Sequence, residues 1–152
     1  MKLSLTRRYS FPASHRLSRA EWSDAENHRV FGKCANAHGH GHNYALEVTV
    51  TGSINPATGM IANLTDLDSF VRARVLDDFD HSNLNEQIPE FRDTIPTTEN
   101  LCRVIFRRLS RFSHARIERV RIEETAKNSF EYVAETAPSR ETAEYEFQEE
   151  HS

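Results

Sequence analysis

Long hydrophobic runs, an excess of basic charge and abundant cysteine are all missing from this chain of 152 residues. No apolar stretch approaches the roughly 20 residues that a membrane-spanning helix needs, so the sequence predicts no membrane segment. Residues 1–5 turn polar and basic too early for a signal peptide. The two cysteines, Cys34 and Cys102, are too few for a disulfide scaffold, and we expect a reducing, cytoplasmic location.

The charge balance also narrows the function. A formal net charge of −4 provides no overall basic field for phosphates, which argues against a general nucleic-acid binder. With 38% hydrophobic and 28% charged residues, the composition is that of a globular protein, and the length suits one domain with a real core. Residues after about 137 are rich in Glu and poor in large aliphatic side chains. We therefore predict one domain over 1–136 and a flexible acidic tail over 137–152.

Periodicity and capping signals give the expected elements. We expect strands over 2–11, 43–52, 117–125 and 129–135. A first helix is expected from Thr65 to about Phe79, and a second begins after Thr97 or Thr98 with Leu101, Ile105 and Leu109 on its inner face. Residues 18–33 are expected to form a loop or a short helix. This order predicts an α+β fold, a four-stranded antiparallel sheet with two helices on one face.

The most informative segment, residues 34–44, holds one thiol and three imidazoles and leads into an alternating strand pattern. If the strand starts early enough, His40 and His42 share one face, because side chains two residues apart in a strand point the same way. A catalytic zinc site needs about three protein ligands and an open position. His15, at the end of the first expected strand, is the best candidate for the third ligand, in competition with the imidazoles of His28, His38 and His81.

Four further residues are candidates for chemistry, each with a simpler alternative. Cys34 is a buried apolar residue, a zinc ligand or a reactive thiolate near bound metal. Asp80 and His81 are a helix C-terminus favoured by the helix dipole, or a pair that moves a proton. Glu124 shares a strand face with apolar residues, so it is either exposed at a frayed end or directed inward toward a donor-rich ligand such as an amino heterocycle.

With these residues in place, the chain resembles the 6-pyruvoyltetrahydropterin synthase family. The matching motifs run in family order over about residues 4–133. They are Phe11-Pro-Ala-Ser-His-Arg-Leu17, Asp24-Ala-Glu-Asn27, Phe31-Gly-Lys-Cys34, His40-Gly-His-Asn-Tyr44, Asn55-Pro-Ala-Thr-Gly-Met60, Asn63-Leu-Thr-Asp-Leu67, Asp80-His-Ser-Asn-Leu84, Thr97-Thr-Glu-Asn100 and Glu124-Thr125.

The resemblance implies a fold, an assembly and a set of site residues. The fold is the tunnelling fold (T-fold), whose subunits join their sheets into a trimeric barrel, and two trimers stack into a homohexamer. Zn²⁺ is expected on the imidazoles of His15, His40 and His42. Cys34 is expected to abstract the proton, with Asp80 and His81 as its relay partners. The resemblance also implies that the pterin is anchored by Glu124 in a pocket lined by Thr98 and Glu99.

The implied reaction converts 7,8-dihydroneopterin triphosphate into 6-pyruvoyltetrahydropterin with loss of triphosphate, as in tetrahydrobiopterin synthesis. Zinc would help where charge develops on the substrate oxygen. The related 6-carboxytetrahydropterin synthases of queuosine synthesis place the cysteine three residues before His-Gly-His, and the pyruvoyl enzymes place it five before. Cys34 satisfies both spacings because His38 precedes His40, but the trailing Asn43 and Tyr44 favour the pyruvoyl register.

Two questions stay open at this level. A non-catalytic zinc- or pterin-binding homologue is a separate hypothesis, against which the presence of Cys34 and Glu124 argues. Candidates for the triphosphate contacts are chosen by charge alone. They are Arg7, Arg8, Arg16 and Lys33.

Overall fold

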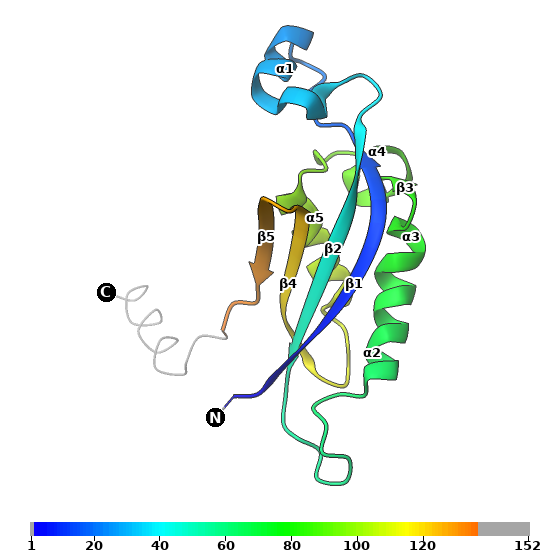
Figure 1. Cartoon of the computed structure of the whole chain (residues 1–152), viewed down its shortest axis with the longest axis vertical. Helices are drawn as coiled ribbons and strands as arrows, with labels where there is room; N and C mark the ends of the chain where they lie inside the picture. The colour runs from blue at the N-terminus through cyan, green and yellow to red at the C-terminus, as the bar shows by residue number, and fades with distance from the viewer. Residues whose placement is uncertain (1, 137–152) are drawn as a thin grey trace, which may run out of the picture.

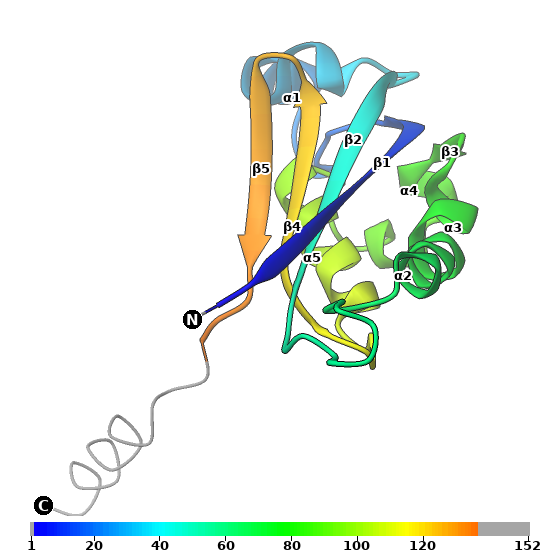
Figure 2. The same cartoon turned by 60° about the horizontal axis from the view of Figure 1, so that its bottom comes forward.

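The computed structural model describes residues 2–136, and the acidic tail predicted for 137–152 lies outside the described residues. One sheet of five strands forms its centre, in the order β3-β1-β2-β4-β5. The strands are β1 (Ser4–His15), β2 (His40–Thr51), β3 (Ser82–Asn83), β4 (Arg116–Thr125) and β5 (Asn128–Val133). Figure 1 shows the long strands side by side, and Figure 2 shows β4 and β5 as a hairpin at one edge.

The four long strands pair antiparallel as predicted, but the prediction of a four-stranded antiparallel sheet is wrong in one respect. The two-residue strand β3 pairs parallel with β1, matching Ala13 with Ser82 and Ser14 with Asn83, so the sheet is mixed. The partners are far apart in the chain, and a strand of two residues has no detectable alternation of its own. Local sequence pattern therefore could not reveal it.

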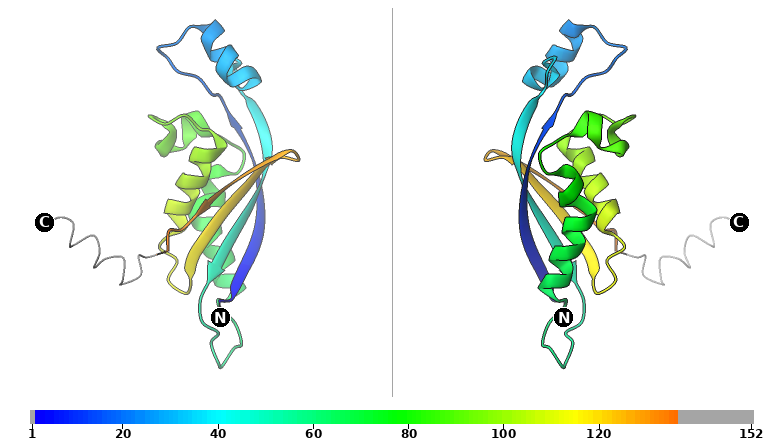
Figure 3. Two further views of the ribbon diagram at one scale, coloured as in Figure 1. Left: turned by 90° about the vertical axis from the view of Figure 1, so that its left-hand side faces the viewer. Right: turned by 90° about the vertical axis from the view of Figure 1, so that its right-hand side faces the viewer.

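The two long helical segments cover one face of the sheet, as predicted. The first is continuous through α2 (Leu64–Val71), the π-helical η2 (Arg72–Leu76) and α3 (Asp77–Phe79). Its cap is Asn63, whose side chain accepts a hydrogen bond from the N–H of Thr65, rather than the expected Thr65. The second is α5 (Thr98–Leu109), capped by Thr97 as expected. Figure 3 shows both helical segments on the same side of the curved sheet.

The core lies between this sheet face and the helices. Alternate residues of β1 and β2 contribute to it, and the predicted inner positions of α5 are fully buried. Its largest buried side chains, each with a burial free energy of roughly 1.5–3 kcal/mol, include Phe11, Tyr44, Leu46, Leu67, Phe79, Leu101, Ile105, Leu109 and Ile122.

The other sheet face, which no helix covers in Figure 3, is polar. Arg119 pairs with Glu131 across β4 and β5 at 3.0 Å, and Arg121 pairs with Glu47 across β4 and β2. Such a face needs no apolar cover, because its charges are matched between neighbouring strands.

Shorter elements surround one end of the sheet. Residues predicted to form a loop or a short helix contain α1 (Asp24–Phe31), followed by η1 (Gly32–Ala35), and α1 projects beyond the strand ends (Figure 1). The helix α4 (Leu84–Gln87) lies next to β3, and η3 (Pro89–Phe91) lies next to α4. No helix within residues 2–136 is long and apolar enough to cross a membrane.

Candidate active site and metal centre

The pairing of β1 with β2 brings the three predicted zinc ligands together. His15, the last residue of β1, lies opposite His40, the first residue of β2, and Ala13 lies opposite His42. The strand therefore begins early enough to put His40 and His42 on the inner face. His15 shares that face and is 1% exposed.

Gly39 allows the start of β2 to approach the end of β1 this closely. Its φ of +64° lies in the left-handed region that favours glycine. A Cβ at this position would also collide with the backbone carbonyl of His15. The glycine just before the ligand pair therefore lets β2 begin in contact with the end of β1.

The three imidazoles converge through their Nε2 atoms. His40 Nε2 lies 3.2 Å from His15 Nε2 and 3.1 Å from His42 Nε2. A ring nitrogen carries either one proton or one lone pair, so these contacts and the nearby thiol cannot all be hydrogen bonds at once. Tetrahedral zinc with Zn–N bonds of about 2.0–2.1 Å separates its nitrogen ligands by about 3.3 Å. The two Nε2–Nε2 distances that involve His40 are therefore close to those around a tetrahedral zinc ion, and imidazole is a ligand type that zinc accepts.

Contacts behind the ligands favour the metal-binding form of the histidines. His15 Nδ1 lies 2.9 Å from the carbonyl oxygen of Pro96, which accepts its proton and leaves the Nε2 lone pair free. Burial lowers the pKa of His15, and burial likewise lowers the pKa of His42. Both imidazoles therefore stay neutral, the state in which they bind metals, at pH values where exposed histidines begin to protonate.

Cys34 lies at the same point, on η1. Its Sγ is 3.2 Å from His40 Nε2, and its side chain is half-buried, so the interpretation as a plain core residue is wrong. Burial, and then the Glu124 carboxylate, raise the pKa of the thiol above its ordinary value. His15, Cys34 and His40 form one possible metal-binding group, so both remaining interpretations, ligand and reactive thiol, are geometrically open.

Glu124 points inward, which excludes the interpretation of a frayed, exposed strand end. Its Oε1 lies 3.7 Å from His42 Nε2 and accepts a 2.7 Å hydrogen bond from the Thr98 hydroxyl, while its Oε2 accepts one of 2.8 Å from Asn128 Nδ2. Burial opposes its ionisation, but these donors and the nearby histidines outweigh burial and lower its pKa. The result is a preformed anionic acceptor beside the histidines.

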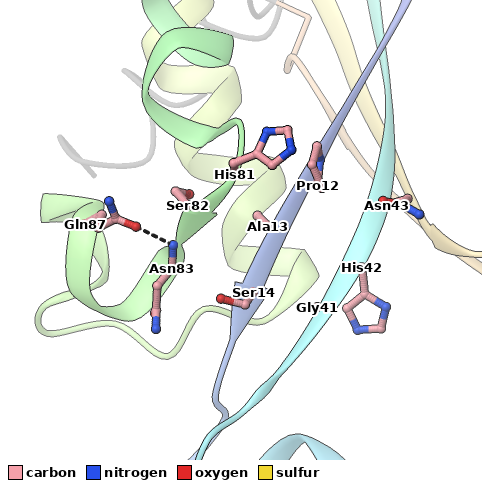
Figure 4. Close-up of a pocket in the computed structure, with 10 residues that line it drawn as sticks. All are labelled: Pro12, Ala13, Ser14, Gly41, His42, Asn43, His81, Ser82, Asn83 and Gln87. Atoms are coloured by element: carbon pink, nitrogen blue, oxygen red, sulfur yellow. Dashed lines mark hydrogen bonds between the residues drawn. The ribbon is translucent and has the colours of Figure 1, made fainter.

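Asp80 and His81 form a pair, but away from the thiol. His81 Nδ1 lies 3.1 Å from Asp80 Oδ2, with side chains that are 79% and 50% exposed. His81 has a φ of +56°, and its N–H donates a 2.7 Å hydrogen bond to the carbonyl of Pro12. Within residues 2–136, no hydrogen bond or ion pair joins either residue to Cys34. His81 and His42 both line one cavity of about 470 Å³. Figure 4 shows them approaching it from different elements, His81 from beyond β1 and His42 from β2.

The remaining predicted site residues differ in whether they contact the histidine cluster and Glu124. Thr98 is buried against Glu124, whereas Glu99 is exposed with no contact to the cluster within the described residues. His28 and His38, which competed with His15, are exposed and outside the cluster. Asn128 was not predicted as a site residue, because its contact with Glu124 depends on the tight turn between β4 and β5. In the sequence, the signal for this turn was the short gap between two expected strands.

Comparisons with known proteins identify the family. A model of the family described as 6-pyruvoyl tetrahydropterin synthase matches residues 4–135. The chain belongs to this family. A relative from Poecilia reticulata, named 6-pyruvoyl tetrahydrobiopterin synthase, is 46% identical over 132 residues, covering 86% of this chain and 90% of the relative. The human protein of the same name is 43% identical, with 86% and 91% covered.

A solved structure supports the fold, and a more distant relative carries the name of the carboxy-type enzyme. The structure of Caenorhabditis elegans 6-pyruvoyl tetrahydropterin synthase superposes with a TM-score of 0.83 at 39% identity, covering 89% of this chain and 97% of that one. An Archaeoglobus fulgidus protein named putative 6-carboxy-5,6,7,8-tetrahydropterin synthase is 36% identical over 115 residues, covering 76% and 82%. The pyruvoyl family and its T-fold are therefore established for this chain, with carboxy-type proteins as more distant relatives.

Proposed function

We propose that the chain is a zinc-dependent 6-pyruvoyltetrahydropterin synthase, a phosphate-eliminating carbon–oxygen lyase acting on 7,8-dihydroneopterin triphosphate. One observation carries the proposal. In a chain of this family, the Nε2 atoms of His15 and His42 each lie 3.1–3.2 Å from His40 Nε2, the Cys34 thiol lies 3.2 Å from the same atom, and the Glu124 carboxylate lies beside His42. Metal ligands, a proton acceptor and a pterin anchor thus occupy one cluster.

The residues divide the work by their chemistry. His15, His40 and His42 would hold the zinc ion, which supplies Lewis acidity to polarise an oxygen on the substrate side chain. Cys34 takes a proton from that side chain, triphosphate leaves, and an internal redox shift yields the product. Glu124 accepts hydrogen bonds from the amino group and ring N–H of the pterin, because its two oxygens are already held in place by Thr98 and Asn128.

A homohexamer of two stacked trimeric barrels accounts for two features of the isolated chain. Within residues 2–136, β3 and β5 are the edge strands of the sheet, and β5 exposes Tyr132 and Val133. The exposed Asp80–His81 pair makes no contact with Cys34 of its own chain. Assembly would cover the edges and let this pair serve as the proton relay for a neighbouring copy.

Two other functions are weighed against this one. The carboxy reaction uses the same substrate, and Cys34 also fits its spacing relative to His38 and His40. However, His38 is exposed and outside the cluster, so the structure favours the register that ends in His42. A non-catalytic homologue would not need the thiol beside the three imidazoles.

The test is incubation of zinc-loaded protein with dihydroneopterin triphosphate, followed by identification of the pterin product after oxidation. We expect release of triphosphate and a pyruvoyl product. A carboxy product would move the chain to the second reaction, and absence of any release would remove the enzyme hypothesis. The Cys34→Ala variant should keep its zinc and lose turnover, and loss of the metal would make Cys34 a ligand instead.

A further inference from the structure

The segment that follows the zinc ligand His15 is held by a side chain from another part of the chain. Asn85, on α4, accepts a 2.8 Å hydrogen bond from the Arg16 N–H at Oδ1 and donates one of 2.9 Å from Nδ2 to the Arg16 carbonyl. The side-chain amide thus satisfies both main-chain groups of one residue, as a strand neighbour does. Since β3 already pairs with β1 at Ser14, Asn85 continues the same ladder past the end of β3.

Arg16 and Leu17 in turn bind η1, the short helix that carries the Cys34 thiol. The Leu17 N–H donates a 2.7 Å hydrogen bond to the carbonyl of Cys34, and the Arg16 Nε donates one of 3.3 Å to the carbonyl of Ala35. Within residues 2–136, these bonds tie η1 to the end of β1. Asn85 therefore acts at the junction between a metal ligand and Cys34.

A second amide repeats the arrangement further along the same segment. Asn27, on α1 and 4% exposed, accepts a 2.8 Å hydrogen bond from the Arg19 N–H and donates one of 3.0 Å to the Arg19 carbonyl. Residues 16–19 are thus fixed at both ends by side-chain amides, while Leu17 between them binds the Cys34 carbonyl. A segment without regular secondary structure thus has main-chain groups of Arg16, Leu17 and Arg19 in hydrogen bonds, as a strand has.

We propose that Asn85 is a positioning residue for the reaction, which it supports by fixing Arg16 and Leu17 so that the Cys34 thiol stays at the histidine cluster. Both polar atoms of the Asn85 side-chain amide are engaged with the main chain of Arg16, and its backbone N–H is fixed by the side chain of Asn83, the cap of α4. The proposal rests on the proposed function for its catalytic part. Its geometric part concerns only the position of Cys34.

The primary test measures that position without using activity. Zinc-loaded wild type, Asn85→Ala and a control, Asn63→Ala, are treated with iodoacetamide, and alkylation of each cysteine is followed by peptide mass spectrometry. Asn63→Ala removes an exposed helix cap remote from the cluster. Cys102 is 2% exposed, and burial raises its pKa to about 12, so its alkylation reports global unfolding. We expect Asn85→Ala to change the Cys34 rate at least about threefold with Cys102 still protected.

Kinetics supply the second measurement. In Asn85→Ala, kcat should fall about 10- to 100-fold while KM stays within about threefold, because a catalytic group is displaced but the Glu124 anchor is untouched. Asn85→Gln keeps both the acceptor and the donor but displaces them by one methylene, so it should lie between Asn85→Ala and wild type. It also replaces Asn85→Ala if the latter exposes Cys102.

The outcomes are separable. Equal Cys34 alkylation in Asn85→Ala and Asn63→Ala, or an equal kcat in both, would overturn the positioning role even if the wild type is active. A wild type without turnover would refute the proposed function, while the alkylation measurement would still decide the geometry.

Discussion

Replacing Thr98 by valine should cost the fold more than a typical threonine substitution, because its hydroxyl serves a charged partner. The hydroxyl lies 2.7 Å from Glu124 Oε1, Thr98 is 3% exposed, and the Glu124 side chain is 15% exposed. Hydrogen bonds to charged groups contribute about 1.5–3 kcal/mol. Valine keeps the shape, so nearly all of that loss should appear in the free energy of unfolding.

A double-mutant cycle isolates this interaction. Urea unfolding of wild type, Thr98→Val, Glu124→Gln and the double variant should give a coupling energy of at least about 1 kcal/mol. Additivity within about 0.5 kcal/mol would refute the reasoning. The folded pKa of Glu124 is lowered, so its contribution is present above the ordinary value of 4.5 and is lost as the pH falls through the folded pKa. The cost of Thr98→Val should therefore shrink in strong acid.

Three further predictions concern the metal and the assembly. His42→Ala should lose stoichiometric zinc by elemental analysis, and full retention would contradict the ligand set. Mixing inactive Cys34→Ala and His81→Ala chains after dissociation and reassembly should restore part of the activity if the relay acts between copies; no recovery would place it within one chain. In the metal-free protein, burial lowers the pKa of His15 and His42 below 6.5, so the unfolded chain binds more protons than the folded one. The urea concentration at the unfolding midpoint should therefore decrease when the pH is lowered from about 7.5 to about 5.5. His15→Gln should reduce that fall, and an unchanged midpoint in the wild type would exclude the effect.

The histidine cluster was partly predictable because local pattern and strand parity both act over short distances. Alternation along 43–52 gave β2, and the period of two then placed His40 and His42 on one face. His15 was harder, because Pro12 and flanking serines hid the last third of β1 from a pattern that ended near residue 11. The resemblance to the family, rather than periodicity, gave the full set of predicted ligands.

The features that could not be predicted from the sequence are contacts between distant segments or specific turns. The pairing of β3 with β1, the clamp of Asn85 on Arg16 and the bond from Asn128 to Glu124 involve groups with no periodic signal. Likewise, nothing in the Asp80–His81 motif indicated that the pair would lie apart from Cys34.

The register of β1 against β2 couples the formation of the histidine cluster to the formation of the core. A slip of one residue would turn every side chain of β1 to the opposite face, so His15 would leave His40 and Phe11 would leave the core together. Misregistered chains would thus lose metal affinity and stability at the same step. If the cluster holds zinc as proposed, zinc added to the metal-free protein would load only the chains whose β1 and β2 are correctly paired.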